Sequence, residues 1–171
     1  SGALTGEKVD AWQKKLKEEE TMAKLLEKAQ AGDGRAMASL GYRYDMQDKD
    51  LEAISWYRRG ADAGNLDCSA LLGGFYIRGN GMDEAQPSLG LVMITEAATN
   101  GCTSACWYLG EQFAGIDSDF PDLKQDEAQA AKWFRKLLEC ADAGRSMRNN
   151  STMIQGVQDW LRQYDEAQAA A

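Results

Sequence analysis

The sequence predicts an all-α fold, an α/α solenoid of about three to four stacked helix-turn-helix repeats with a capping helix at each end. Two observations predict it. Short alanine-containing turns close at Gly32, Gly64, Gly101 and Gly144, and three of these glycines are followed nine residues later by the glycine of a Leu-Gly pair. Bulky apolar residues recur at helical spacing between the turns. Arrays of this kind normally work by presenting a surface to a partner.

The first helix of each repeat is predicted by residues at offsets of four, eight, nine and twelve after the turn glycine. These offsets fall on one face of a helix and place a small residue where two helices must approach closely. We call this element helix A. Its matching residues in the three copies are Ala36, Leu40, Gly41 and Tyr44; Cys68, Leu72, Gly73 and Tyr76; and Ala105, Leu109, Gly110 and Phe113.

The second helix of each repeat, helix B, ends at the next turn glycine, which can take the left-handed conformation that stops a helix. Trp133 lies eleven residues before Gly144, whereas Trp56 lies eight residues before Gly64. We therefore expect nearly one extra helical turn in the third helix B. The bulky residues of the three copies are Trp56-Tyr57, Met93-Ile94 and Trp133-Phe134.

Both ends of the chain are predicted to be caps. Apolar residues at helical spacing predict one long amphipathic helix, or two, before the first repeat and a closing helix after the last. We divide the chain into an N-terminal capping region (1–28), the repeats (29–148), and a C-terminal capping helix with a frayed tail (149–171). The two apolar stripes are Val9, Trp12, Leu16, Ala23 and Leu26, and Met153, Ile154, Val157, Leu161 and Tyr164.

These residues resemble the Sel-one-like repeat family, whose members are close relatives of the tetratricopeptide repeat. The resemblance covers roughly residues 21–148 and implies a right-handed superhelix. Members of such a family share a scaffold far more than a task. The residues that carry the resemblance are Ala36, Leu40-Gly41, Tyr44, Ala53, Trp56-Tyr57, Ala61, Gly64 and the glycine-rich connector Gly79-Asn80-Gly81-Met82.

The four cysteines are Cys68, Cys102, Cys106 and Cys140. Some secreted members of the family pair a cysteine at the end of helix B with one early in the next helix A. Cys106 and Cys140 have no cysteine at the matching positions, so we expect reduced thiols with a structural role and a cytoplasmic protein. The chain begins Ser1-Gly2, which leaves room for an upstream targeting segment that has been removed.

Composition argues against several classes of function. The formal net charge is −8 and no basic stripe with stacking aromatics is present, so we expect no nucleic-acid partner. No apolar run is long enough to predict a membrane span. The chain has no histidine, which removes the usual general base, and it has no complete phosphate-binding loop. We therefore expect no enzyme activity, no cofactor and no metal site.

In a tetratricopeptide-like superhelix, the side of helix A opposite its core face lines the concave groove. Aromatic residues ringed by charge on this side have the composition of binding hot spots. Tyr42 and Trp107 could equally pack against an adjacent repeat. The predicted partner-binding residues are Arg35, Tyr42, Asp45, Asp67, Ile77, Trp107 and Glu111.

Three hypotheses follow for the function. The first is a non-enzymatic adaptor or scaffold that binds a peptide or a partner protein in the concave groove. We expect it to be a monomer rather than a homo-oligomer. The second is an acidic inhibitor, immunity or chaperone-like protein that masks a dedicated basic partner. The third assigns the function to the caps, where an exposed Trp12 or Trp160 would mediate self-association or docking.

Overall fold

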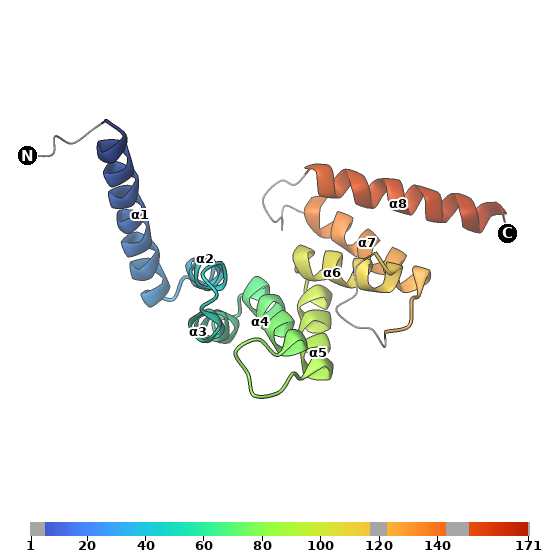
Figure 1. The fold of residues 1–171 in the computed structure, drawn as a ribbon. Coiled ribbons are helices and arrows are strands. Elements are labelled where there is room, and N and C mark those ends of the chain that lie inside the picture. Colours follow the sequence, from blue (N-terminus) through green and yellow to red (C-terminus); the bar gives the residue numbers. More distant parts are fainter. Residues whose placement is uncertain (1–5, 117–122, 143–150, 171) are drawn as a thin grey trace, which may run out of the picture. The chain divides into compact units, whose positions relative to one another are not determined.

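The computed structural model of the chain describes residues 6–116, 123–142 and 151–170, and every regular element in these ranges is an α-helix (Figure 1). The predicted all-α class is therefore confirmed. The helices are α1 (Gly6–Gln30), α2 (Gly34–Asp45), α3 (Asp50–Asp62), α4 (Leu66–Arg78), α5 (Pro87–Thr99), α6 (Thr103–Ala114), α7 (Glu127–Asp142) and α8 (Ser151–Ala170).

The chain divides into two compact units, Ser1–Asn65 and Leu66–Ala171. The first unit holds α1, α2 and α3, in which α2 packs against both neighbours. In the second unit each helix from α4 to α8 packs against the next, and α4 also contacts α6, one repeat further on. Contact between successive helices and between equivalent helices of neighbouring repeats is the packing expected of a helical solenoid.

Helices α2, α4 and α6 are the three copies of helix A, and α3, α5 and α7 are the three copies of helix B. The turn glycines before each helix A have the positive φ that was predicted, 94° at Gly32, 81° at Gly64 and 96° at Gly101. Asp33 then caps α2, because its carboxylate accepts hydrogen bonds from the backbone N–H groups of Arg35 and Ala36 at 2.9 and 3.1 Å. Gly144 lies outside the described residues.

A glycine in helix A allows helix B to approach closely. A Cβ atom on Gly41 would collide with the Tyr57 ring, and one on Gly110 would collide with the Phe134 ring. The second repeat has no aromatic residue at this contact. There Gly73 faces Gly90, and a Cβ on Gly73 would lie 2.8 Å from the Gly90 carbonyl oxygen. The two backbones of α4 and α5 therefore nearly touch.

The extra turn predicted for the third helix B is present. Helix α7 has 16 residues, whereas α3 and α5 have 13 each. Asp126 caps its start by accepting a hydrogen bond from the Gln129 N–H at 3.0 Å. Phe134 lies seven residues after the start of α7, as Tyr57 does in α3, and it lies beneath Gly110 as Tyr57 lies beneath Gly41. The three extra residues extend the C-terminal end of α7.

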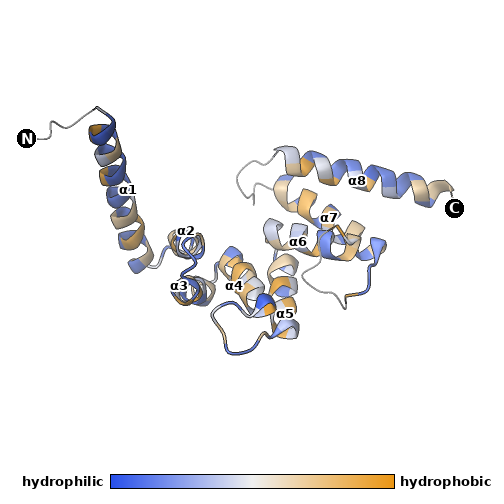
Figure 2. Cartoon of the chain, in the orientation of Figure 1, coloured by the Kyte–Doolittle hydropathy of each residue, from blue (hydrophilic) through white to orange (hydrophobic). Residues whose placement is uncertain are grey.

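The two terminal helices differ in how they are covered within their own units. Helix α1 has only Ala29 buried, with Trp12 63% exposed, and Figure 2 shows it as a largely hydrophilic helix. Helix α8 packs on α7 and buries Val157 and Leu161 in the core of the second unit. It continues to Ala170, so the structure places most of the segment expected to fray inside the last helix.

The proposed three-part domain division remains a prediction. No described helix has the length and apolar character that crossing a membrane requires.

All four cysteines are buried and unpaired with one another. Burial raises the pKa of Cys68 and Cys106 to about 12 and the pKa of Cys102 to about 11. These three thiols therefore remain protonated at neutral pH, which suits a packing role.

We expect the raised thiol pKa of Cys68 to appear as a pH dependence of stability. The thiol of an unfolded chain titrates at about pH 8.5. Above that pH the unfolded state loses a proton that the folded state keeps. The free energy of unfolding therefore falls as pH rises towards 12. The stability advantage of the wild type over Cys68→Ala should shrink by about 1–3 kcal/mol between pH 8 and 10.5. Urea denaturation of both proteins measures it, and a constant difference across this range would contradict the assignment.

Candidate functional site

The seven predicted partner-binding residues belong to two different compact units. Arg35, Tyr42 and Asp45 lie on α2 of the first unit, where Arg35 is exposed, Tyr42 is 55% exposed and Asp45 is half-buried. The other four residues lie in the second unit. Within that unit the structure brings two of them, Trp107 and Glu111, together in one pocket and places the other two elsewhere.

The expectation that Ile77 lies on the open side of helix A is wrong. Ile77 is 4% exposed and belongs to the hydrophobic core of the second unit. The cause is the close approach of α5, since a Cβ on Gly90 would lie only 2.6 Å from Ile77 Cγ1. Glycine at position 90 thus lets helix B cover a residue that the repeat pattern leaves open.

Asp67 makes hydrogen bonds within the chain. Its Oδ1 accepts a hydrogen bond from Ser104 Oγ at 3.0 Å and another from Cys102 Sγ at 3.3 Å. Asp67 is in the first turn of α4, and Ser104 is in the first turn of α6. The carboxylate therefore joins the starts of two successive A helices, and the binding of a partner by Asp67 stays a prediction.

We expect this contact to couple the two repeats energetically. A double-mutant cycle of Asp67→Ala and Ser104→Ala should give a coupling energy of about 0.5–1.5 kcal/mol. Each single substitution already removes the hydrogen bond, so the double variant should lose less stability than the sum of the two single losses. Urea denaturation of the four proteins measures it. Strictly additive losses would show that the bond contributes nothing to stability.

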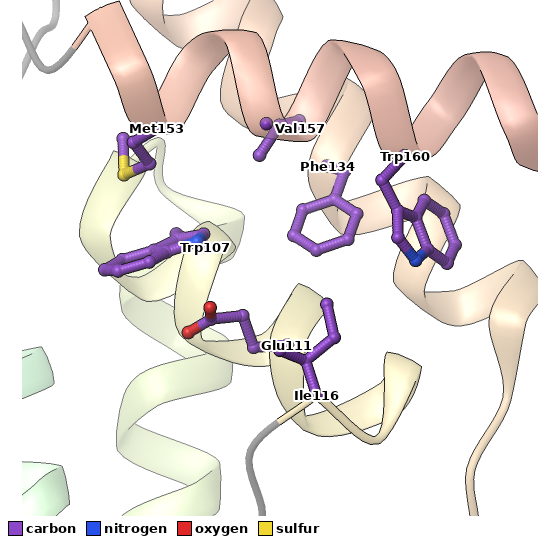
Figure 3. A pocket seen from close by; sticks show the side chains of 8 residues that line it. Trp107, Glu111, Ile116, Phe134, Met153, Val157 and Trp160 are labelled. Atoms are coloured by element: carbon purple, nitrogen blue, oxygen red, sulfur yellow. The ribbon is translucent and has the colours of Figure 1, made fainter.

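A pocket of about 250 Å³ lies between α6, α7 and α8 of the second unit (Figure 3). Trp107 and Glu111 face it from α6, one helical turn apart, so both side chains lie on the same face of that helix. Phe134 of α7 and residues of α8 supply the other walls. The lining residues are Trp107, Glu111, Ile116, Phe134, Met153, Gly156, Val157 and Trp160.

Aromatic contacts hold one wall of the pocket in place. The rings of Trp160 and Phe134 meet edge to face with centroids 5.0 Å apart, and Trp160 stacks on Tyr164 at 5.5 Å. The Arg135 guanidinium lies 5.9 Å from the Tyr164 ring and pairs with Asp165. Trp160 is accordingly half-buried, so the expectation that it is exposed is wrong. Trp12, the other residue of that hypothesis, is 63% exposed, and self-association through it stays a prediction.

Phe134, Met153 and Val157 were not predicted to belong to a site, and Trp160 was predicted only as an exposed residue of the C-terminal cap. One signal was present, because Met153, Val157 and Trp160 recur at four and three residues and so share one face of a helix. That face was predicted to pack, and the structure uses part of it to line a pocket.

The chemistry of the pocket is that of a binding surface. Seven of its eight lining residues are apolar or glycine, and Glu111 supplies the one carboxylate among them. The described residues contain no group of three or more histidine, cysteine, aspartate or glutamate residues that could hold a metal ion. A half-open apolar pocket with one acceptor group can orient a guest side chain.

The packing of paired helices around glycine contacts defines a helical-repeat protein of the α/α-solenoid class. The chain is similar to a protective antigen present in uropathogenic Escherichia coli strains that displays an SLR fold, with 32% identity over 69% of this chain and a TM-score of 0.54. It is also similar to a Sel1 repeat protein from Oxalobacter formigenes, with 27% identity over 82% of this chain and 98% of that one, again with a TM-score of 0.54. Both similarities support a Sel1-like repeat family for this chain.

The chain spans 25% of the length of the E. coli antigen. No family model and no curated protein matches the sequence. Both similar structures are helical-repeat proteins, and such proteins characteristically act as scaffolds for interaction with other proteins.

Proposed function

We propose that the chain is a non-enzymatic adaptor that binds a peptide segment of another protein, and that the pocket between α6, α7 and α8 anchors this segment. The observation that carries the proposal is the convergence of Trp107, Phe134 and Trp160 on one pocket beside the carboxylate of Glu111. Large aromatic side chains in a partly enclosed site are the residues that most often dominate binding energy.

The size of the pocket supports a peptide over a free small molecule. Its volume of about 250 Å³ is below the roughly 300–1,000 Å³ that is usual for small-molecule sites. One or two side chains of a bound segment would fill it, and the rest of the segment would lie along the surface of helix A. Helical-repeat surfaces suit this mode because they are extended and largely pre-formed.

We also propose Arg35, Tyr42 and Asp45 as a separate contact surface on the first helix A. Tyr42 is 55% exposed and lies between two charged residues on the helix face opposite the core. The proposed partner is a protein, with no nucleic acid involved, and the protein itself is proposed to act as a monomer.

Peptides selected by display on the immobilised protein provide the test. Trp107→Ala should weaken the binding of a selected peptide at least about 10-fold, because a hot-spot aromatic contributes about 2 kcal/mol or more. Trp12→Ala is the matched control, since Trp12 is 63% exposed and lies on α1 of the other compact unit. Fluorescence anisotropy measures both affinities, and equal affinity for wild type and Trp107→Ala would overturn the pocket assignment.

The net charge of −8 favours the inhibitor of a basic partner as a second candidate. Electrostatic steering would then give an association rate that falls about 10-fold or more between 50 and 500 mM salt. Stopped-flow measurement with a captured partner separates the two functions. An adaptor anchored by aromatic side chains would instead keep its association rate within about two- to threefold, since apolar contacts are not screened by salt.

A further inference from the structure

We propose that the pocket between α6, α7 and α8 accepts a cationic side chain, arginine or lysine, from the bound segment. The inference rests on the proposed adaptor function and specifies the chemistry of the partner. It is carried by the arrangement of Glu111 and Trp107, a carboxylate and an indole ring that face one pocket from adjacent turns of α6 (Figure 3).

The two groups can act on the same guest. Aromatic faces attract cations through their quadrupole, most often the guanidinium of arginine. A carboxylate accepts charge-assisted hydrogen bonds from the same head group. Glu111 also takes part in an interaction within the chain. Its two oxygens offer about four acceptor sites, so a guest can be bound in addition to that interaction.

The remaining walls match the stem of such a side chain. Ile116, Met153 and Val157 are apolar and line the pocket around the two binding groups. Arginine and lysine carry three or four methylene groups below their charge and bury these along apolar surface while the head group keeps its polar partners. A neutral apolar guest would use the same walls but would leave the Glu111 carboxylate desolvated, which is costly.

Charge complementarity favours the same guest. The residues that line the pocket include no lysine or arginine. The nearby Arg135 is paired with Asp165, and the whole chain carries a formal charge of −8. A cation that enters the pocket therefore meets the Glu111 carboxylate and no positive charge in the lining.

The test uses two probes that differ in charge and hardly in shape, N-acetyl-arginine methylamide and N-acetyl-citrulline methylamide. Each is titrated into the ¹⁵N-labelled protein while the indole N–H signals of Trp107 and Trp160 are followed. We expect the arginine probe to bind about 3- to 10-fold more tightly than the citrulline probe. Glu111→Gln should reduce the preference for the arginine probe over the citrulline probe, because it removes the charge of the carboxylate and keeps its shape.

Equal affinity for the two probes would overturn the inference, and so would the absence of any shift at Trp107 with up to 100 mM arginine probe. The peptide selection distinguishes this failure from failure of the adaptor function. Selected peptides that depend on Trp107 but lack a basic residue would refute the cationic guest and keep the adaptor. Arginine binding at the pocket without any selectable peptide would refute the adaptor and keep the cation site.

Discussion

Phe134→Ala is expected to lower the free energy of unfolding by about 3–5 kcal/mol, the usual loss for a buried aromatic residue. The Phe134 side chain is 2% exposed, lies against Gly110 of α6 and meets the Trp160 ring of α8 edge to face. Its removal opens a cavity where three helices of the second unit converge. Urea denaturation followed by circular dichroism measures the loss.

Phe134→Leu is the control for this experiment, because leucine retains most of the apolar volume and should cost less than about 1.5 kcal/mol. A loss below about 1 kcal/mol for Phe134→Ala would mean that α6, α7 and α8 do not share this contact. The same variant should also weaken peptide binding, since Phe134 forms part of the pocket wall.

Gly110→Leu is expected to destabilise the protein by about 3 kcal/mol, although leucine is a better helix former than glycine by nearly 1 kcal/mol. A side chain at this position would collide with the Phe134 ring, so α6 and α7 would have to separate. Gly156→Leu is the matched control because Gly156 is also helical and has nothing within 4 Å of the position of its Cβ. That variant should be neutral or slightly stabilising.

A double variant tests the cause directly. Reducing the ring in Phe134→Ala should relieve the collision, so Gly110→Leu combined with Phe134→Ala should lose less stability than the sum of the single losses. Strict additivity in the double variant would contradict a contact between these two residues. Thermal unfolding of the set gives the comparison.

The repeat pattern predicted most of the fold because its signals are local. The turn glycines at 32, 64 and 101 have the positive φ that their position in each copy required. The displacement of Trp133 relative to Trp56 predicted the extra turn of α7 because helix length is counted along the sequence. Residues that act through the backbone of their own helix are therefore well predicted by sequence.

The candidate site was predicted only in part because it depends on contacts between helices. Ile77 was misplaced since Gly90, on the next helix, determines whether it is covered. Asp67 meets Ser104 across 37 residues of sequence, a contact that no periodicity reveals. Trp107 and Glu111 were found on α6, but the opposite wall of their pocket comes from α8, which lies outside the repeat pattern.

The most direct test of the central proposal is the chemical-shift footprint of a display-selected peptide on the ¹⁵N-labelled protein. If the chain is an adaptor that anchors its partner between α6, α7 and α8, the largest perturbations should fall on the backbone and indole signals of Trp107, Glu111 and Trp160. Trp107→Ala should abolish them, while Trp12→Ala should leave them in place. Perturbations confined to α1 or α5, with the Trp107 and Trp160 signals unmoved at saturation, would contradict the account.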